Sequence, residues 1–170
     1  MNTLTCEGYG AVMASVQRRQ LEFGSLDEVV ADATRLLRDG YEQAGNWDLA
    51  QVAGHLATWM RFPLEGFPRK APLMMWVLRN MFGRSLRRKI LRERKMVERG
   101  FTLKETVPAP SGDAAGAVAK LRQTIERFKG HIGEYHPSPL FGAMSRDEYT
   151  QLQLIHCAHH LSFLVPHKAG

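Results

Sequence analysis

The sequence contains few cysteines and no long apolar run. Cys6 and Cys157 are its only thiols, and two cysteines so far apart provide neither a disulfide framework nor a paired-cysteine metal clip. We expect Cys157, which lies within a helical pattern, to be a small buried residue. No window approaches the roughly 18 to 20 consecutive apolar residues that would cross a bilayer. The sequence therefore argues against a disulfide-stapled fold and against an integral membrane protein.

Signals for secretion and for several kinds of catalysis are also missing. Arg18 and Arg19 lead into Gln20 and Glu22 instead of an apolar stretch, so we find no secretory leader and expect a cytoplasmic protein. There is no Ser-His-Asp pattern, no phosphate-binding loop and no dinucleotide-binding fingerprint. Mechanisms that depend on a nucleophilic side chain or on a nucleotide therefore have no support in the sequence.

What the sequence does contain is helical periodicity. Its 170 residues, 44% of them hydrophobic, are enough for a single domain over 1–170 with its own core. Ser25 and Ser145 each begin a capping-box pattern, and Asp48 is the expected N-cap of another helix. We predict an all-α, antiparallel four-helix bundle without a β-hairpin. Its main helices are expected at 27–44, 48–62, 113–135 and from Ser145 to Leu164, with a loose N-terminal arm (1–20), a core (21–166) and a crossover (63–112) that contains an extra helix.

Three histidines fall on inward faces of two predicted helices. His156 and His160 are four residues apart, a spacing that stacks two imidazoles on one side of a helix so that both reach an ion at about 2.1 Å. His55 lies among apolar residues on the inward face of 48–62. Because three buried imidazoles are costly to desolvate without a partner, the pattern favours a metal site. A lone inward histidine is more often a hydrogen-bonded core residue, and His159 could compete as a ligand.

Three neutral imidazoles would leave at least one coordination position of the ion open. A water at that position would have its pKa lowered towards about 7, and a thiol would be held as the thiolate. Other polar residues on these helices and loops are candidates for contacts around the metal or for proton transfer. They are Asp48, Gln51, His136, Tyr149, Gln153 and His159.

The chain resembles the DinB/YfiT-like superfamily over about 21–166. The segment Gly45–Leu49 leading to His55, and the terminal run from His156 to Leu161, carry this resemblance. His136-Pro137, Phe141-Gly142, the Ser145 cap and the run from His159 to Pro166 resemble the branch catalogued as domain of unknown function 1569. In one respect the chain departs from the pattern, since Tyr149 stands where relatives often carry tryptophan.

The resemblance implies a four-helix bundle whose two middle helices are joined by a long crossover. It also implies one divalent ion, nickel or zinc or a similar metal, on His55, His156 and His160, which leaves His159 outside the ligand set. Members of the superfamily include thiol-dependent S-transferases and isomerases that bind a low-molecular-weight thiol at the metal, and many proteins with no known activity.

Two classes of function follow. The first is a metal-dependent enzyme, either a thiol S-transferase or a hydrolase, whose substrate the sequence does not name. The second is a non-catalytic, metal-containing bundle that acts through a surface or through a dimer contact. A homodimer is compatible with both.

Basic residues are concentrated between Arg79 and Arg99. Nine basic residues and two acidic ones give this segment a charge of +7, whereas the whole chain has a net charge of +6, so the rest of the chain sums to about −1. The simplest interpretation is the solvated face of a crossover helix. The apolar run 73–78 and Met81-Phe82 also suit an amphipathic helix at an anionic membrane surface. Nucleic-acid binding is disfavoured, because no helix-turn-helix or aromatic stacking pattern accompanies the charges. A fourth interpretation is recruitment of an anionic substrate to the metal site, for which the candidates are Arg87, Arg88 and Arg92.

Overall fold

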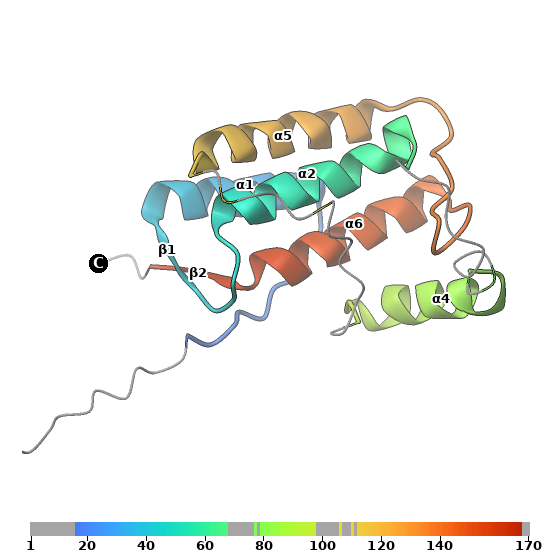
Figure 1. Ribbon diagram of the computed structural model, residues 1–170, viewed down its shortest axis with the longest axis horizontal. Helices are drawn as coiled ribbons and strands as arrows, with labels where there is room; N and C mark the ends of the chain where they lie inside the picture. The colour runs from blue at the N-terminus through green and yellow to red at the C-terminus, as the bar shows by residue number, and fades with distance from the viewer. Residues whose placement is uncertain are drawn as a thin grey trace, which may run out of the picture.

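A computed structural model of the protein describes residues 16–67, 77, 79–97, 106, 110 and 112–167. Within these residues the chain is mostly helical, with a small two-stranded sheet (Figure 1). Residues 1–15 of the predicted arm, Cys6 among them, and the apolar run up to Trp76 lie outside the described residues. In chain order the elements are α1 (Leu26–Asp39), β1 (Tyr41–Gln43), α2 (Leu49–Glu65), the π-helix η1 (Arg79–Gly83), α4 (Arg84–Glu93), α5 (Ala114–Gly130), α6 (Arg146–Leu161) and β2 (Leu164–Pro166).

Four helices surround the apolar core. Helix α2 packs along α5 and contacts α1 and α6, and α1 contacts α5 and α6 (Figure 1). Each helix contributes side chains at helical spacing, so that the apolar stripes meet in the middle. The largest fully buried side chains are Tyr149, Phe128, Leu36, Leu49, Leu56, Met60, Leu121, Ile125, Leu161, Leu164, Val29 and Val52.

Serine caps start two of the helices where the sequence predicts them. Ser145 accepts a hydrogen bond from the Glu148 amide at 3.2 Å, and Glu148 accepts one from the Ser145 amide at 2.9 Å. Ser25 accepts from the Glu28 amide at 3.3 Å, but the Glu28 carboxylate accepts from the amide of Gly24, at 2.9 Å. The predicted reciprocal bond at this cap is therefore shifted by one residue.

The ends of the first and last helices differ from the prediction. Helix α1 ends at Asp39 and not at Ala44, because Gly40 adopts a positive φ of 77° and donates its amide to Leu36. The chain then forms β1, which pairs antiparallel with β2, Tyr41 lying opposite Pro166. Helix α6 ends at Leu161 and not at Leu164, because 164–166 forms the partner strand β2. The all-α prediction therefore missed this small sheet, although the pair is no β-hairpin, because its two strands lie far apart in the sequence.

Helix α2 continues past Pro63 to Glu65, whereas the sequence predicts an end at Phe62. A proline inside a helix leaves the carbonyl four residues earlier without its amide partner. Here that carbonyl belongs to Trp59, and it accepts a hydrogen bond from the side-chain amide of Gln153 on α6, at 3.3 Å. The buried Gln153 thus replaces the bond that Pro63 cannot make.

The predicted crossover contributes a further helix, as expected. Helix α4 follows η1 and lies along α6 at the edge of the molecule (Figure 1). Helix α5 ends at Gly130 and not at Tyr135. None of the helices described here is long and apolar enough to span a bilayer.

Candidate metal centre

Helices α2 and α6 bring the three predicted histidines together. One ring nitrogen from each of His55, His156 and His160 lies within 4.8 Å of the others. The ring centroids are 4.5 Å apart for His55 and His160, 4.7 Å for His156 and His160, and 5.3 Å for His55 and His156. Nitrogens bound to one tetrahedral ion at about 2.1 Å are roughly 3.4 Å apart. Small side-chain rotations would therefore bring all three nitrogens onto an ion.

The position of the proton on His55 is set by the crossover. His55 Nδ1 lies 2.8 Å from the backbone carbonyl oxygen of Thr106, which is also buried. Because a carbonyl oxygen can only accept, Nδ1 carries the proton and Nε2 keeps its lone pair. Protein ligands to metals commonly have their second ring nitrogen fixed in this way. His55 is thus held in the tautomer whose Nε2 is free to bind a metal ion.

The environment keeps all three imidazoles neutral. Burial lowers the pKa of His55, although its bond to the Thr106 carbonyl opposes this effect. Burial lowers the pKa of His156 well below its ordinary value, and the neighbouring histidines add to the effect. Burial, His55, His159 and then Arg18 lower the pKa of His160 to about 2. Neutral imidazoles are the form that binds a metal, so no proton has to leave at neutral pH.

Two tryptophans flank the cluster. The Trp47 ring lies nearly parallel to that of His160, at a centroid distance of 5.4 Å and an angle of 6°, and meets His55 edge-on at 5.0 Å. Trp59 stands edge-on to His156 at 5.9 Å. These rings fix the imidazole planes and lower the local dielectric, which strengthens electrostatic interactions at the site.

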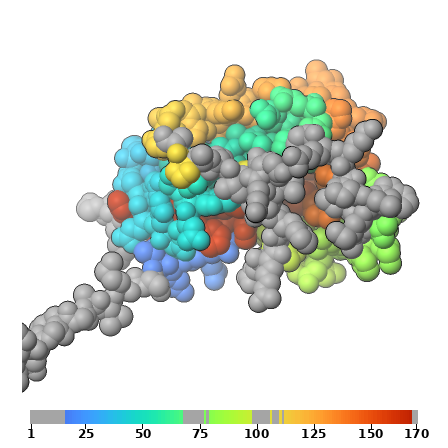
Figure 2. Space-filling model, in the orientation of Figure 1, coloured from blue at the N-terminus to red at the C-terminus, as the bar shows by residue number. Residues whose placement is uncertain are grey.

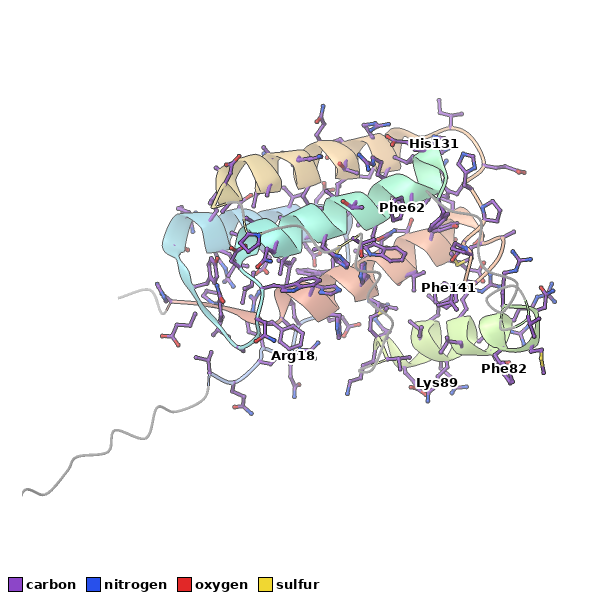
Figure 3. All side chains as sticks on the ribbon, in the orientation of Figure 1. Arg18, Phe62, Phe82, Lys89, His131 and Phe141 are labelled. Carbon is purple, nitrogen blue, oxygen red and sulfur yellow. The ribbon has the colours of Figure 1, made fainter. Side chains whose placement is uncertain are left out.

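His159 lies beside the cluster and faces the N-terminal segment. Its ring is edge-on to His160 at 4.9 Å, and its Nδ1 accepts a hydrogen bond from Arg18 at 3.2 Å. Arg18 also donates to the His159 carbonyl at 3.1 Å and to Ser162 Oγ at 2.5 Å, and its guanidinium lies 4.2 Å from the centre of the Phe163 ring (Figure 3). This part of the predicted loose arm is therefore attached to the end of α6.

Asp48 and Gln51 form the reciprocal cap of α2. Asp48 Oδ1 accepts from the Gln51 amide at 2.7 Å, and Gln51 Oε1 accepts from the Asp48 amide at 3.2 Å. The cap fixes where α2 begins, about two turns before His55. The described bonds of these two residues thus position the helix that carries the first histidine.

Tyr149 and His136 lie at the other end of α6. The Tyr149 hydroxyl donates to the His136 carbonyl at 2.6 Å, and burial raises the pKa of Tyr149 to about 12. The His136 amide donates to the Pro63 carbonyl at 2.9 Å, while its side chain is exposed. Together these bonds hold the loop after α5 against the end of α2. None of the described hydrogen bonds or ring contacts of these two residues is with the three histidines.

The arginines predicted to recruit anions lie on α4. Arg87 is held to α6, with its Nε 3.2 Å from a Glu148 carboxylate oxygen and a hydrogen bond of 2.8 Å to the Ala143 carbonyl. Arg92 is exposed and pairs with Glu93 at 3.3 Å, and Arg88 is also exposed. None of their described contacts reaches the histidine cluster.

Sequence reasoning missed several residues that shape the site. Trp47 precedes the first residue of α2, so helical spacing could not place it, whereas Trp59, one turn after His55, was expected on the same face as His55. Thr106 acts through its backbone carbonyl, which leaves no trace in residue type. Arg18 reaches α6 from 141 residues away in sequence, so no local pattern could have revealed its contact with His159.

Comparison with known proteins adds one finding. A family model described as a protein of unknown function (DUF1569) matches residues 15–167, a range that contains all three histidines, both flanking tryptophans and Arg18. No curated protein and no solved structure matches the chain. Because this match covers nearly the whole length, the chain belongs to the DUF1569 family.

Proposed function

We propose that this protein binds one divalent metal ion on His55, His156 and His160. The observation that carries the proposal is the convergence of three imidazoles within 4.8 Å, one buried and two partly buried, with His55 held by the Thr106 carbonyl in the tautomer that leaves Nε2 free. A purely structural cluster would be expected to satisfy its ring nitrogens by hydrogen bonds to one another or to the backbone. Imidazole ligands suit zinc and nickel, which are the ions we propose.

We also propose that the four packed helices form an antiparallel four-helix bundle of the DinB/YfiT-like kind, comprising the single domain 1–170. The support is that α1, α2, α5 and α6 share one apolar core, with α4 outside it. Ligands supplied from two facing helices are typical of metal sites in such bundles.

The proposed activity is that of a metal-dependent thiol S-transferase or a hydrolase. When bound, the ion would lower the pKa of a thiol or water at its open coordination position. The chain itself would hold the three ligands neutral, orient His55 through Thr106, and shield the site with Trp47 and Trp59. A low-molecular-weight thiol is the small molecule that we expect to bind there.

Elemental analysis of the purified protein tests the metal site. Wild type should carry one divalent ion per chain, and His55→Ala and His156→Ala should each carry little or none. His131→Ala is the matched control, because the described contacts of the His131 side chain are with the nearby Glu134 carbonyl and the Tyr135 ring and not with the cluster. Full metal content in both cluster variants would contradict the proposal.

Thiol titration of the cobalt-substituted protein separates an enzyme from a non-catalytic bundle. Direct binding of glutathione, mycothiol or bacillithiol to cobalt should add a thiolate charge-transfer band, and the same titration of the His131→Ala control should reproduce it. If no thiol alters the spectrum and no hydrolysable ester is turned over, the non-catalytic alternative is supported.

A further inference from the structure

Helix α4 has one side against the protein and one side in solvent. Ile90 and Gly83 are buried, and Arg87 is paired with Glu148 on α6. A Cβ atom at Gly83 would lie 2.5 Å from the Leu140 carbonyl oxygen, so glycine allows the loop 138–142 to sit directly on the start of α4. The opposite side of the helix forms part of the molecular surface (Figure 2).

Large apolar side chains are exposed at the start of this edge. Met81 is 65% exposed, Phe82 is 55% exposed, and Val77 is 39% exposed. Among the described residues only six large apolar side chains are this exposed, and three of them fall between 77 and 82. Scattered exposed apolar residues need no explanation, but a local cluster commonly marks a binding surface. Phe82 and Lys89 both lie on the outer edge of this segment (Figure 3).

Cations that have no partner among the described residues occur in the same segment as these apolar side chains. Arg79 and Arg84 line a surface cleft of about 520 Å³, and the described residues that line it include no carboxylate. Neither arginine makes an ion pair or hydrogen bond with a described residue, and the same holds for the exposed Arg88 and Lys89. The remaining wall of the cleft is formed by Asn80, Pro137, Phe141, Gly142 and Ala143.

We propose that this edge of the protein docks on an anionic lipid bilayer. Met81 and Phe82 enter the apolar layer, Arg79 and Arg84 receive a lipid phosphate in the cleft, and Arg88 and Lys89 face neighbouring headgroups. Cations beside exposed apolar side chains match a bilayer, in which phosphates border an acyl layer. Nucleic acid would satisfy the cations but would leave Met81 in water.

The proposal is tested by co-sedimentation of the full chain with phosphatidylcholine vesicles, with and without about 30% phosphatidylglycerol as the anionic lipid. Wild type should bind the anionic vesicles and not the neutral ones, and binding should weaken as salt rises. The double variant Met81→Ser/Phe82→Ser should bind at least tenfold more weakly. The variant Arg79→Gln/Arg84→Gln should also lose on the order of tenfold or more, since each cation near an anionic surface contributes roughly a fivefold factor.

Matched controls lie elsewhere on the surface. Ile132 is 96% exposed after α5, and Lys120 is exposed on α5, so Ile132→Ser and Lys120→Gln should bind like wild type. His55→Ala should also keep vesicle binding, which separates this proposal from that for the metal site. Circular dichroism and thermal unfolding of each variant should be measured to check that the fold is intact.

Four outcomes would overturn the proposal. The first is absence of binding to anionic vesicles, and the second is binding that survives in both double variants. The third is tight binding to single-stranded or duplex DNA that depends on Arg79 and Arg84 but not on Met81 and Phe82, which would identify a nucleic acid as the partner. Binding of free inorganic phosphate in the cleft, without vesicle binding, would likewise identify a soluble anion as the ligand instead of a bilayer.

Discussion

The metal-free protein is expected to lose stability steeply as the pH falls below about 6.5. In the folded state the pKa of each of His55, His156 and His160 is lowered, mainly by burial. In the unfolded chain these histidines take up protons at about pH 6.5. Below that pH the unfolded state binds more protons than the folded state, so the free energy of unfolding decreases with decreasing pH. The window extends from about pH 6.5 down to the folded-state values.

The size of the effect follows from the number of histidines. Each neutral buried histidine lowers the free energy of unfolding by about 1.4 kcal/mol for every pH unit below the unfolded pKa. His156 and His160, whose pKa values are lowered furthest, together give about 3 kcal/mol per unit and thus about 5 kcal/mol at pH 4.5, and His55 adds to this loss in the upper part of the range. Because a domain of this size has roughly 5–15 kcal/mol in total, mild acid should remove much of the stability of the metal-free protein.

Urea denaturation between pH 7.5 and 4.5 measures this slope. Carboxylates also titrate in the lower part of this range, so the diagnostic quantity is the difference between wild type and His156→Gln. That variant removes one proton-binding group, and its curve should be shallower by about 1.4 kcal/mol per pH unit. His131→Gln, which lies outside the cluster, should follow wild type. Parallel curves for wild type and His156→Gln below pH 6.5 would refute the reasoning.

Three further predictions concern the metal, a glycine contact and a thiol. Zinc or nickel at 100 times its Kd should raise the free energy of unfolding by about 2.7 kcal/mol, measured by urea denaturation, and EDTA should reverse the gain. Gly83→Ala should cost about 1–3 kcal/mol because its Cβ would meet the Leu140 carbonyl, whereas Gly130→Ala, with nothing within 4 Å, should be close to neutral. Burial raises the pKa of Cys157 to about 12, so a Cys6→Ser variant should react with Ellman's reagent only after unfolding, and rapid reaction of the folded protein would contradict this.

Much of the local structure could be predicted from the sequence, because its causes are local. Serine and aspartate caps act on amides three residues away, so Ser145 and Asp48 marked the starts of α6 and α2. Helical periodicity placed His55, His156 and His160 on inward faces, and the two histidines a turn apart on α6 needed only one helix to become neighbours. The ends of helices were less predictable, since Gly40 and the strand pair it introduces depend on the far end of the chain.

The sequence by itself therefore determined which side chains could serve as ligands, through residue type and helical spacing. Only the tertiary structure decided that α2 and α6 face each other at the depth where three nitrogens meet, and that Thr106 fixes the proton on His55. It also decided that Arg18 lies against His159 and that Trp47 stacks on His160. These contacts join residues 51 to more than 100 positions apart, and their distances come from the packing of whole helices around the core. No spacing within a single helix contains that information.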